Sequence, residues 1–89
     1  MPLYAMTLLA VGPPDEFRLS AERHRAHLRL LRAAGKVRLA GEFTKEEGFL
    51  EIYEVADRLE ADALARSSPL VEDGLASWMI REWVELPLD

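Results

Sequence analysis

The sequence predicts a single α+β domain in which two helices cover one face of a four-stranded antiparallel sheet. Three observations support this fold class. The chain has 89 residues, which is the size of one domain. Short segments rich in strand-forming residues alternate with two segments that have the period of an amphipathic helix. The segments follow one another as strand, helix, strand, strand, helix, strand.

The first half of the chain begins with a predicted strand over residues 3–11, an apolar run that ends at Gly-Pro-Pro (residues 12–14). Both alternating sides of this strand are apolar, so both of its faces are expected to be covered. The first helix is predicted over residues 20–34. Ser20 is a good N-cap residue, and Gly35 provides the C-terminal stop.

The second half begins with a predicted hairpin whose strands are residues 36–43 and 49–55. The second helix is predicted over residues 57–66, because Asp57 followed by Glu60 resembles a capping box and a proline lies three residues beyond the end. The last strand is predicted over residues 75–86. This βαββαβ order is that of the ferredoxin-like fold.

The arrangement leaves one face of the sheet without helices. The first and last strands nevertheless carry large apolar side chains on both sides. A domain of this size also buries a limited share of its surface alone. We therefore expect a second copy of the chain to cover the open face, which gives a homodimer.

The charge balance excludes some classes of protein. With 11 basic and 16 acidic residues, the net charge of −5 argues against a general nucleic-acid binder, which needs basic residues to neutralise phosphates. The chain has no cysteine, so it has no thiolate metal site. Its first residues lack a basic leader and form too short an apolar run to span a bilayer, so no membrane association and a cytoplasmic location are expected.

The two histidines of the chain, His24 and His27, lie on the predicted first helix. At about 100° per residue, both fall within the apolar arc that contains Leu28 and Leu31, so both are expected to face the sheet. Three interpretations remain open. Each imidazole is a core group with a hydrogen-bond partner, a proton-transfer group in a pocket, or a metal ligand for which no third ligand is evident.

Two further positions are candidates for a site. Ser67 and Ser68 are placed where a hydroxyl can hydrogen-bond an imidazole, although a Ser-Ser-Pro sequence also commonly ends a helix. Trp83 lies on the side of the last strand opposite Trp78, and we interpret it as an interface residue or a pocket wall. No nucleophile elbow, phosphate loop or calcium loop is present, and no metal or cofactor is predicted.

The segment RHRAHLRLLRAAGKVRLAGEF, together with SSPLVEDGL before a Trp-bearing last strand, resembles the YciI-like (YCII-related) proteins of the dimeric α+β barrel superfamily. The resemblance covers nearly the whole chain, residues 1–89. It equates the histidine of the family with His27 and places His24, with Arg23 beside it, where the family commonly has an arginine. The family has Asp-Pro-Phe-like residues after the second helix, where this chain has Ser68-Pro69-Leu70.

The resemblance implies a ferredoxin-like homodimer with a pocket between the first helix and the sheet. It also implies relatives, such as muconolactone isomerases and dehydrochlorinases, that act on small ring compounds. If the chain is an enzyme of this kind, His27 and Ser68 would be catalytic, and Arg23, His24 and Trp83 would bind substrate. The reaction would be proton transfer, isomerisation or elimination on a small cyclic or acidic metabolite.

The serine in place of the family's aspartate leaves alternatives open, because a hydroxyl does not stabilise an imidazolium as a carboxylate does. One alternative is a ligand-binding or accessory dimeric module that has lost the acid–base pair. The other is a purely structural dimer.

Overall fold

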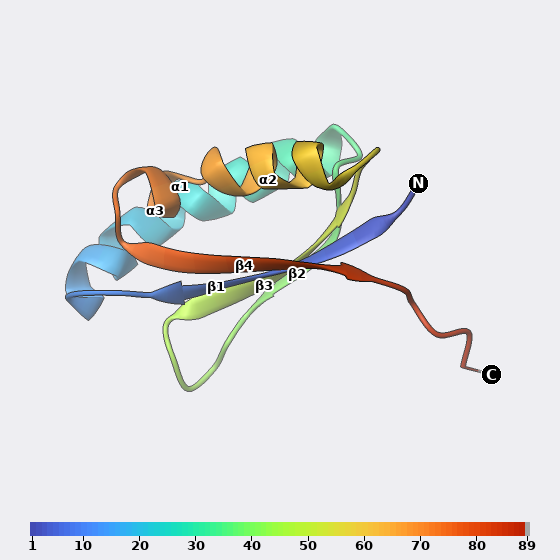
Figure 1. Cartoon of the computed structure of the whole chain (residues 1–89). Coiled ribbons are helices and arrows are strands. Elements are labelled where there is room, and N and C mark those ends of the chain that lie inside the picture. Colours follow the sequence, from blue (N-terminus) through green and yellow to red (C-terminus); the bar gives the residue numbers. More distant parts are fainter. Residues whose placement is uncertain (89) are drawn as a thin grey trace.

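The computed structural model describes residues 1–88 and has the predicted element order, with one additional short helix between the second predicted helix and the last strand (Figure 1). The elements are β1 (Leu3–Ala10), α1 (Pro14–Ala33), β2 (Val37–Glu42), β3 (Gly48–Glu54), α2 (Arg58–Arg66), α3 (Pro69–Glu72) and β4 (Ala76–Trp83). The strands form one antiparallel sheet in the order β2-β3-β1-β4. All three helices lie on the same face of the sheet, so the predicted ferredoxin-like arrangement is confirmed (Figure 1). No helix within residues 1–88 has the length and apolar character needed to cross a bilayer.

Helix α1 starts six residues earlier than the sequence predicted, because Pro14 and not Ser20 opens it. A proline fits the first turn of a helix, where its fixed φ is helical and its missing N–H would have had no partner. Asp15 and Glu16 follow in the first turn and complement the positive end of the helix dipole. The extra turn carries Phe17, whose ring packs on Phe49 with centroids 6.2 Å apart.

The predicted end of α1 is confirmed at Gly35. This glycine has a positive φ of 76°, which side-chain-bearing residues rarely adopt. Lys36 N–H donates to the carbonyl of Leu31 and Gly35 N–H donates to that of Arg32, which is the Schellman pattern. At α2, the Asp57 side chain accepts from the backbone N–H of Glu60 at 2.9 Å, so the predicted cap is confirmed.

Strand β4 is shorter than predicted and ends at Trp83, so the extension to residue 86 is wrong. The register explains the end, because Trp83 pairs with Leu3, the first residue of β1. Among residues 1–88, no neighbouring strand continues beyond that pair to hydrogen-bond β4. The chain then runs away from the body of the domain (Figure 1).

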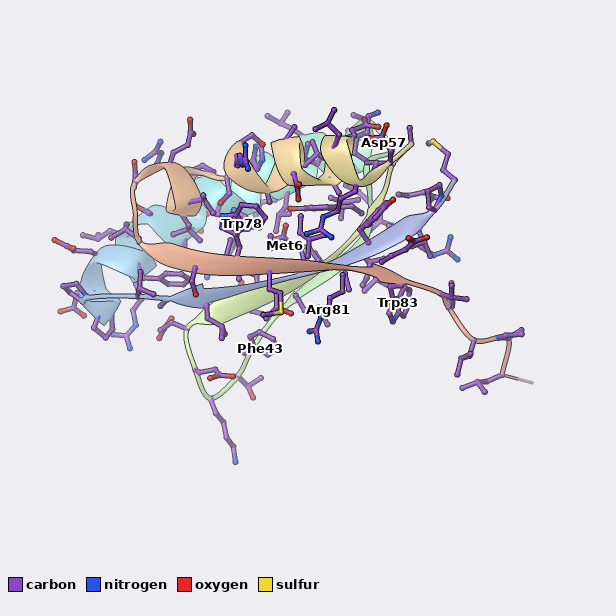
Figure 2. All side chains as sticks on the ribbon, viewed as in Figure 1. Met6, Phe43, Asp57, Trp78, Arg81 and Trp83 are labelled. Atoms are coloured by element: carbon purple, nitrogen blue, oxygen red, sulfur yellow. The ribbon has the colours of Figure 1, made fainter. Side chains whose placement is uncertain are left out.

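The hydrophobic core lies between the sheet and the helices. On β1, Tyr4, Met6 and Leu8 alternate into it, while the residues between them face the other side of the sheet. The neighbouring strands add Phe49, Tyr53 and Ile80. Figure 2 shows Met6 and Trp78 on the helix side of the sheet and Phe43, Arg81 and Trp83 on the other side.

The face of the sheet without helices carries large apolar side chains, as the sequence predicted. The side chains involved are well exposed in the single chain: Leu9, Leu39, Leu50, Met79 and Trp83. The homodimer through this face stays a prediction.

Gly48 provides a test of the packing between β3 and β1. A Cβ at this position would lie 2.5 Å from the Leu8 carbonyl oxygen, which is backbone and cannot swing away. Gly48→Ala is therefore expected to lower the free energy of unfolding by about 1–3 kcal/mol, the usual cost of overpacking. The control is Gly41→Ala, because a Cβ there meets nothing within 4 Å, and a change within about 0.5 kcal/mol is expected. Urea denaturation measures both, and equal losses would contradict the steric argument.

Candidate active site

His24 is the centre of a polar cluster in the core. On α1 it follows Phe17 and Ala21 at spacings of seven and three residues, so the three share the face that packs on the sheet. The imidazole is fully buried. Since a buried imidazole is costly without partners, its hydrogen bonds decide what it does.

Both ring nitrogens of His24 have partners. Nε2 lies 2.6 Å from Glu51 Oε2, and Nδ1 lies 2.9 Å from Ser68 Oγ. Glu51 comes from the middle of β3, and Ser68 is the N-cap residue of α3. Three elements that are far apart in the sequence therefore meet at one side chain.

The partners determine which nitrogen carries the proton. Ser68 Oγ accepts from the backbone N–H of Leu70 at 3.2 Å, which leaves its own hydrogen to donate to Nδ1. The Glu51 carboxylate only accepts, so it receives the proton on Nε2. Every donor and acceptor is then satisfied with a neutral imidazole protonated at Nε2, and no buried side-chain N or O within residues 1–88 lacks a partner.

A carboxylate inside a hydrophobic core needs strong donors, and Glu51 has two. Besides His24, the hydroxyl of Tyr53 donates to Glu51 Oε1 at 2.9 Å. Burial, reinforced by the adjacent Glu51 charge, raises the pKa of Tyr53 well above its ordinary value of 10.0. Tyr53 therefore stays protonated and remains a donor over the whole physiological range. The result is a continuous chain of hydrogen bonds from Tyr53 through Glu51 and His24 to Ser68.

His27 is placed differently from His24, although their ring centroids are only 6.2 Å apart. Its side chain is half-buried, and Nε2 lies 3.1 Å from Ser67 Oγ. Ser67 donates its hydrogen to the carbonyl of Leu64 at 2.7 Å, so its oxygen accepts from His27 Nε2–H. Nδ1 has no hydrogen-bond partner among residues 1–88 and is not sealed from solvent. Burial lowers the pKa of His27 below its ordinary 6.5.

The remaining sequence-predicted residues lie apart from the histidines. Arg23 points to the surface, where its guanidinium contacts Asp73 at 3.1 Å. Trp83 is on the open face of the sheet (Figure 2), whereas both histidines belong to α1, which covers the other face. Within one chain the structure thus joins Ser68 to His24 and Ser67 to His27, and brings neither Arg23 nor Trp83 to them.

Sequence reasoning missed Glu51 and Tyr53. The signal was present in the alternation of β3. Phe49, Glu51, Tyr53 and Val55 share one side of the strand, and that side is the buried one. A lone acid in a row of large apolar residues marks a buried charge that must have a partner.

A groove lies between α1 and the edge strand β2, close to this cluster. One part of it has a volume of about 380 Å³. Its lining includes Phe49, whose ring meets the His24 ring edge-on with centroids 4.6 Å apart. Residues 1–88 hold no group of three or more side chains arranged to bind a metal ion.

Comparison with known proteins places the chain in a family. The model of the YCII-related domain matches residues 7–84. The chain belongs to the YCII-related family. No curated protein matches the sequence at a significant level.

Among solved structures, the chain is similar to 5-chloro-2-hydroxyhydroquinone dehydrochlorinase (TftG) from Burkholderia phenoliruptrix AC1100, which was solved in complex with 2,5-dihydroxybenzoquinone. The TM-score is 0.71 at 18% sequence identity, and the match covers 92% of this chain and 93% of that one. At this identity the likeness shows a shared fold.

Glu51→Gln is expected to lower the free energy of unfolding by about 1–3 kcal/mol, because a buried hydroxyl or ring N–H then loses its acceptor. The two carboxylate oxygens of Glu51 accept from Tyr53 O–H and His24 Nε2–H, and an amide offers a single oxygen in their place. Urea denaturation measures the loss. The matched comparison is Glu51→Gln in a Tyr53→Phe background, where the amide oxygen is free to face His24 and a smaller loss is expected. Equal losses in the two backgrounds would contradict the assigned network.

The lowered pKa of His27 makes stability depend on pH. When the pH falls below about 6.5, the unfolded chain takes up the proton first, so the free energy of unfolding declines. The stability that depends on neutral His27 is fully present above pH 6.5, and it is lost as the pH falls through the lower pKa of the folded chain. Denaturation between pH 7.5 and 5.5 should show a shallower decline for His27→Gln than for the parent chain. Identical slopes would show that His27 titrates in the folded chain as it does in the unfolded one.

Proposed function

We propose that this YCII-related protein is a small-molecule enzyme in which His24 transfers a proton on a small cyclic or acidic compound. The observation that carries the proposal is the 2.6 Å contact between His24 Nε2 and the buried Glu51 carboxylate, with the Ser68 hydroxyl on the other nitrogen. An imidazole held between a carboxylate and a hydroxyl is the arrangement used for general acid–base catalysis.

The proposed step runs through Ser68. A substrate proton passes to Ser68 Oγ while the serine hydrogen passes to His24 Nδ1. The resulting imidazolium lies against Glu51, whose charge stabilises it. In an isomerisation the proton returns to another atom of the substrate. In an elimination the leaving group departs as an anion with its electron pair, and the proton goes to solvent.

Glu51 would supply the carboxylate that the chain lacks at the position of the family's aspartate. The family's aspartate is replaced by Ser68, but a carboxylate reaches the same imidazole from β3 and contacts the opposite nitrogen. An acid–base pair is therefore available although the expected motif is absent. The pairing also favours His24 over His27 as the counterpart of the family's histidine, because His24 is the one that Ser68 contacts.

Access to this pair requires movement, since His24, Ser68 and Phe49 are all buried. Substrate would enter from the groove between α1 and β2, and Phe49 or the short helix α3 would shift. The homodimer belongs to the same proposal. A second copy on the open sheet face would bury its exposed leucines together with Met79 and Trp83, and Trp83 would then be an interface residue.

Two observations support competing assignments. Among residues 1–88, Nδ1 of His27 has no hydrogen-bond partner, and the pKa of His27 is lowered. His27 is therefore neutral and able to accept a proton at pH 7 without any movement. Conversely, both nitrogens of His24 are occupied in a fully buried ring, which suits a structural role in a ligand-binding or accessory module.

Proton transfer is tested with a panel of chlorinated and unchlorinated hydroxyquinols and small lactones. NMR in D₂O detects exchange of substrate hydrogens, and a chloride electrode detects elimination. We expect turnover, with kcat about 10²–10⁴-fold lower in Glu51→Gln and less than tenfold lower in His27→Gln. Melting curves establish that both variants fold.

The opposite pattern, with His27→Gln inactive and Glu51→Gln active, would move the base to His27. Binding of 2,5-dihydroxybenzoquinone without exchange or release from any compound would favour the accessory module.

A further inference from the structure

The groove between α1 and β2 is lined by arginines, by larger apolar side chains and by a few small residues. It consists of two adjoining hollows, of about 360 Å³ and 380 Å³, which share Leu28, Arg29 and Ala40. Ala33 of α1 and Ala40 of β2 leave the space between helix and strand unfilled. β2 is an edge strand, so no further strand closes this side of the groove.

Arginines line the groove at a regular helical spacing. Arg25, Arg29 and Arg32 stand four and three residues apart on α1 and share one side of the helix. They are concentrated on a protein whose net charge is −5. This side of α1 is therefore a local cationic patch on an acidic molecule.

The three arginines differ in how well their charge is neutralised. Arg25 donates twice to Glu42, at 2.5 and 2.9 Å, and also to Glu22. The Arg25 guanidinium correspondingly lowers the pKa of Glu42. By contrast, Arg29 reaches Glu22 only at 4.0 Å, and Arg32 has no ion-pair partner within residues 1–88. The guanidinium groups of Arg29 and Arg32 thus have no carboxylate closer than 4.0 Å among residues 1–88.

We infer that this groove binds the carboxylate of a small aromatic acid, with Arg29 and Arg32 on the carboxylate and the ring against Leu28 and Ala40. A guanidinium presents paired donors that match a carboxylate, and neighbouring apolar side chains favour a flat ring over a strongly hydrated ion. The identity of this ligand as the substrate rests on the proposed function, because Phe49 joins the groove to His24. The binding itself does not depend on His24.

The test compares benzoate with benzamide, which have the same ring and nearly the same size but differ in charge. Titration of the ¹⁵N-labelled full chain is followed by amide NMR shifts. We expect benzoate to shift the backbone signals of residues 28–33 and 37–42 and to bind at least tenfold more tightly than benzamide. The benzoate affinity should fall as salt is raised from 20 to 300 mM, because these guanidinium groups are exposed to screening ions.

Three variants locate the site. Arg29→Gln with Arg32→Gln should weaken benzoate binding at least tenfold and leave benzamide unchanged. Ala40→Leu should weaken both ligands because it fills the groove without altering charge. The control, Arg18→Gln, removes an arginine from the opposite end of α1, where it contacts Asp15 and Glu47, and should have no effect.

Equal binding of benzoate and benzamide, or shifts confined to another region, would overturn the inference. So would an unchanged benzoate affinity in the double arginine variant. The result is separable from that of the proposed function. Benzoate binding by the parent chain is measured without any turnover, so it is expected even if no compound of the substrate panel reacts.

Discussion

The buried contact between His24 and Glu51 is the constraint on which the rest of the site depends. A carboxylate among core side chains requires donors, and the donors come from α1 and from Tyr53 on the same strand. Removing one partner would leave an uncompensated charge in a water-free interior, which typically costs about 3–5 kcal/mol. The pair therefore fixes where α1 lies on the sheet as firmly as the apolar contacts around it.

Ser68 connects this pair to the third element. Its hydroxyl caps α3 by accepting from Leu70 and donates to His24, so one oxygen serves both the backbone and the imidazole. A serine in this position is thus more than a helix stop. It completes the hydrogen bonding of the imidazole, while Glu51 on β3 supplies the negative charge.

The sheet separates two kinds of surface. Its helix side holds the polar cluster and, at the edge, the arginine-lined groove. Its open side carries large exposed apolar side chains. Trp83 belongs to the second surface and the histidines to the first. A single chain consequently has its polar cluster and its exposed apolar side chains on opposite sides of four strands.

The sequence by itself determined the element order, the faces of the strands, the end of α1 at Gly35 and the inward position of His24, because these follow from local periodicity and capping. It misplaced the start of α1, since a proline that breaks a strand also opens a helix, and it extended β4 beyond its last pairing partner. Only the tertiary structure decided that Ser68 meets His24, that Ser67 meets His27 and that Glu51 supplies the carboxylate. Those contacts join residues 27 to 44 positions apart, and packing between separate elements, rather than spacing along the chain, selects them.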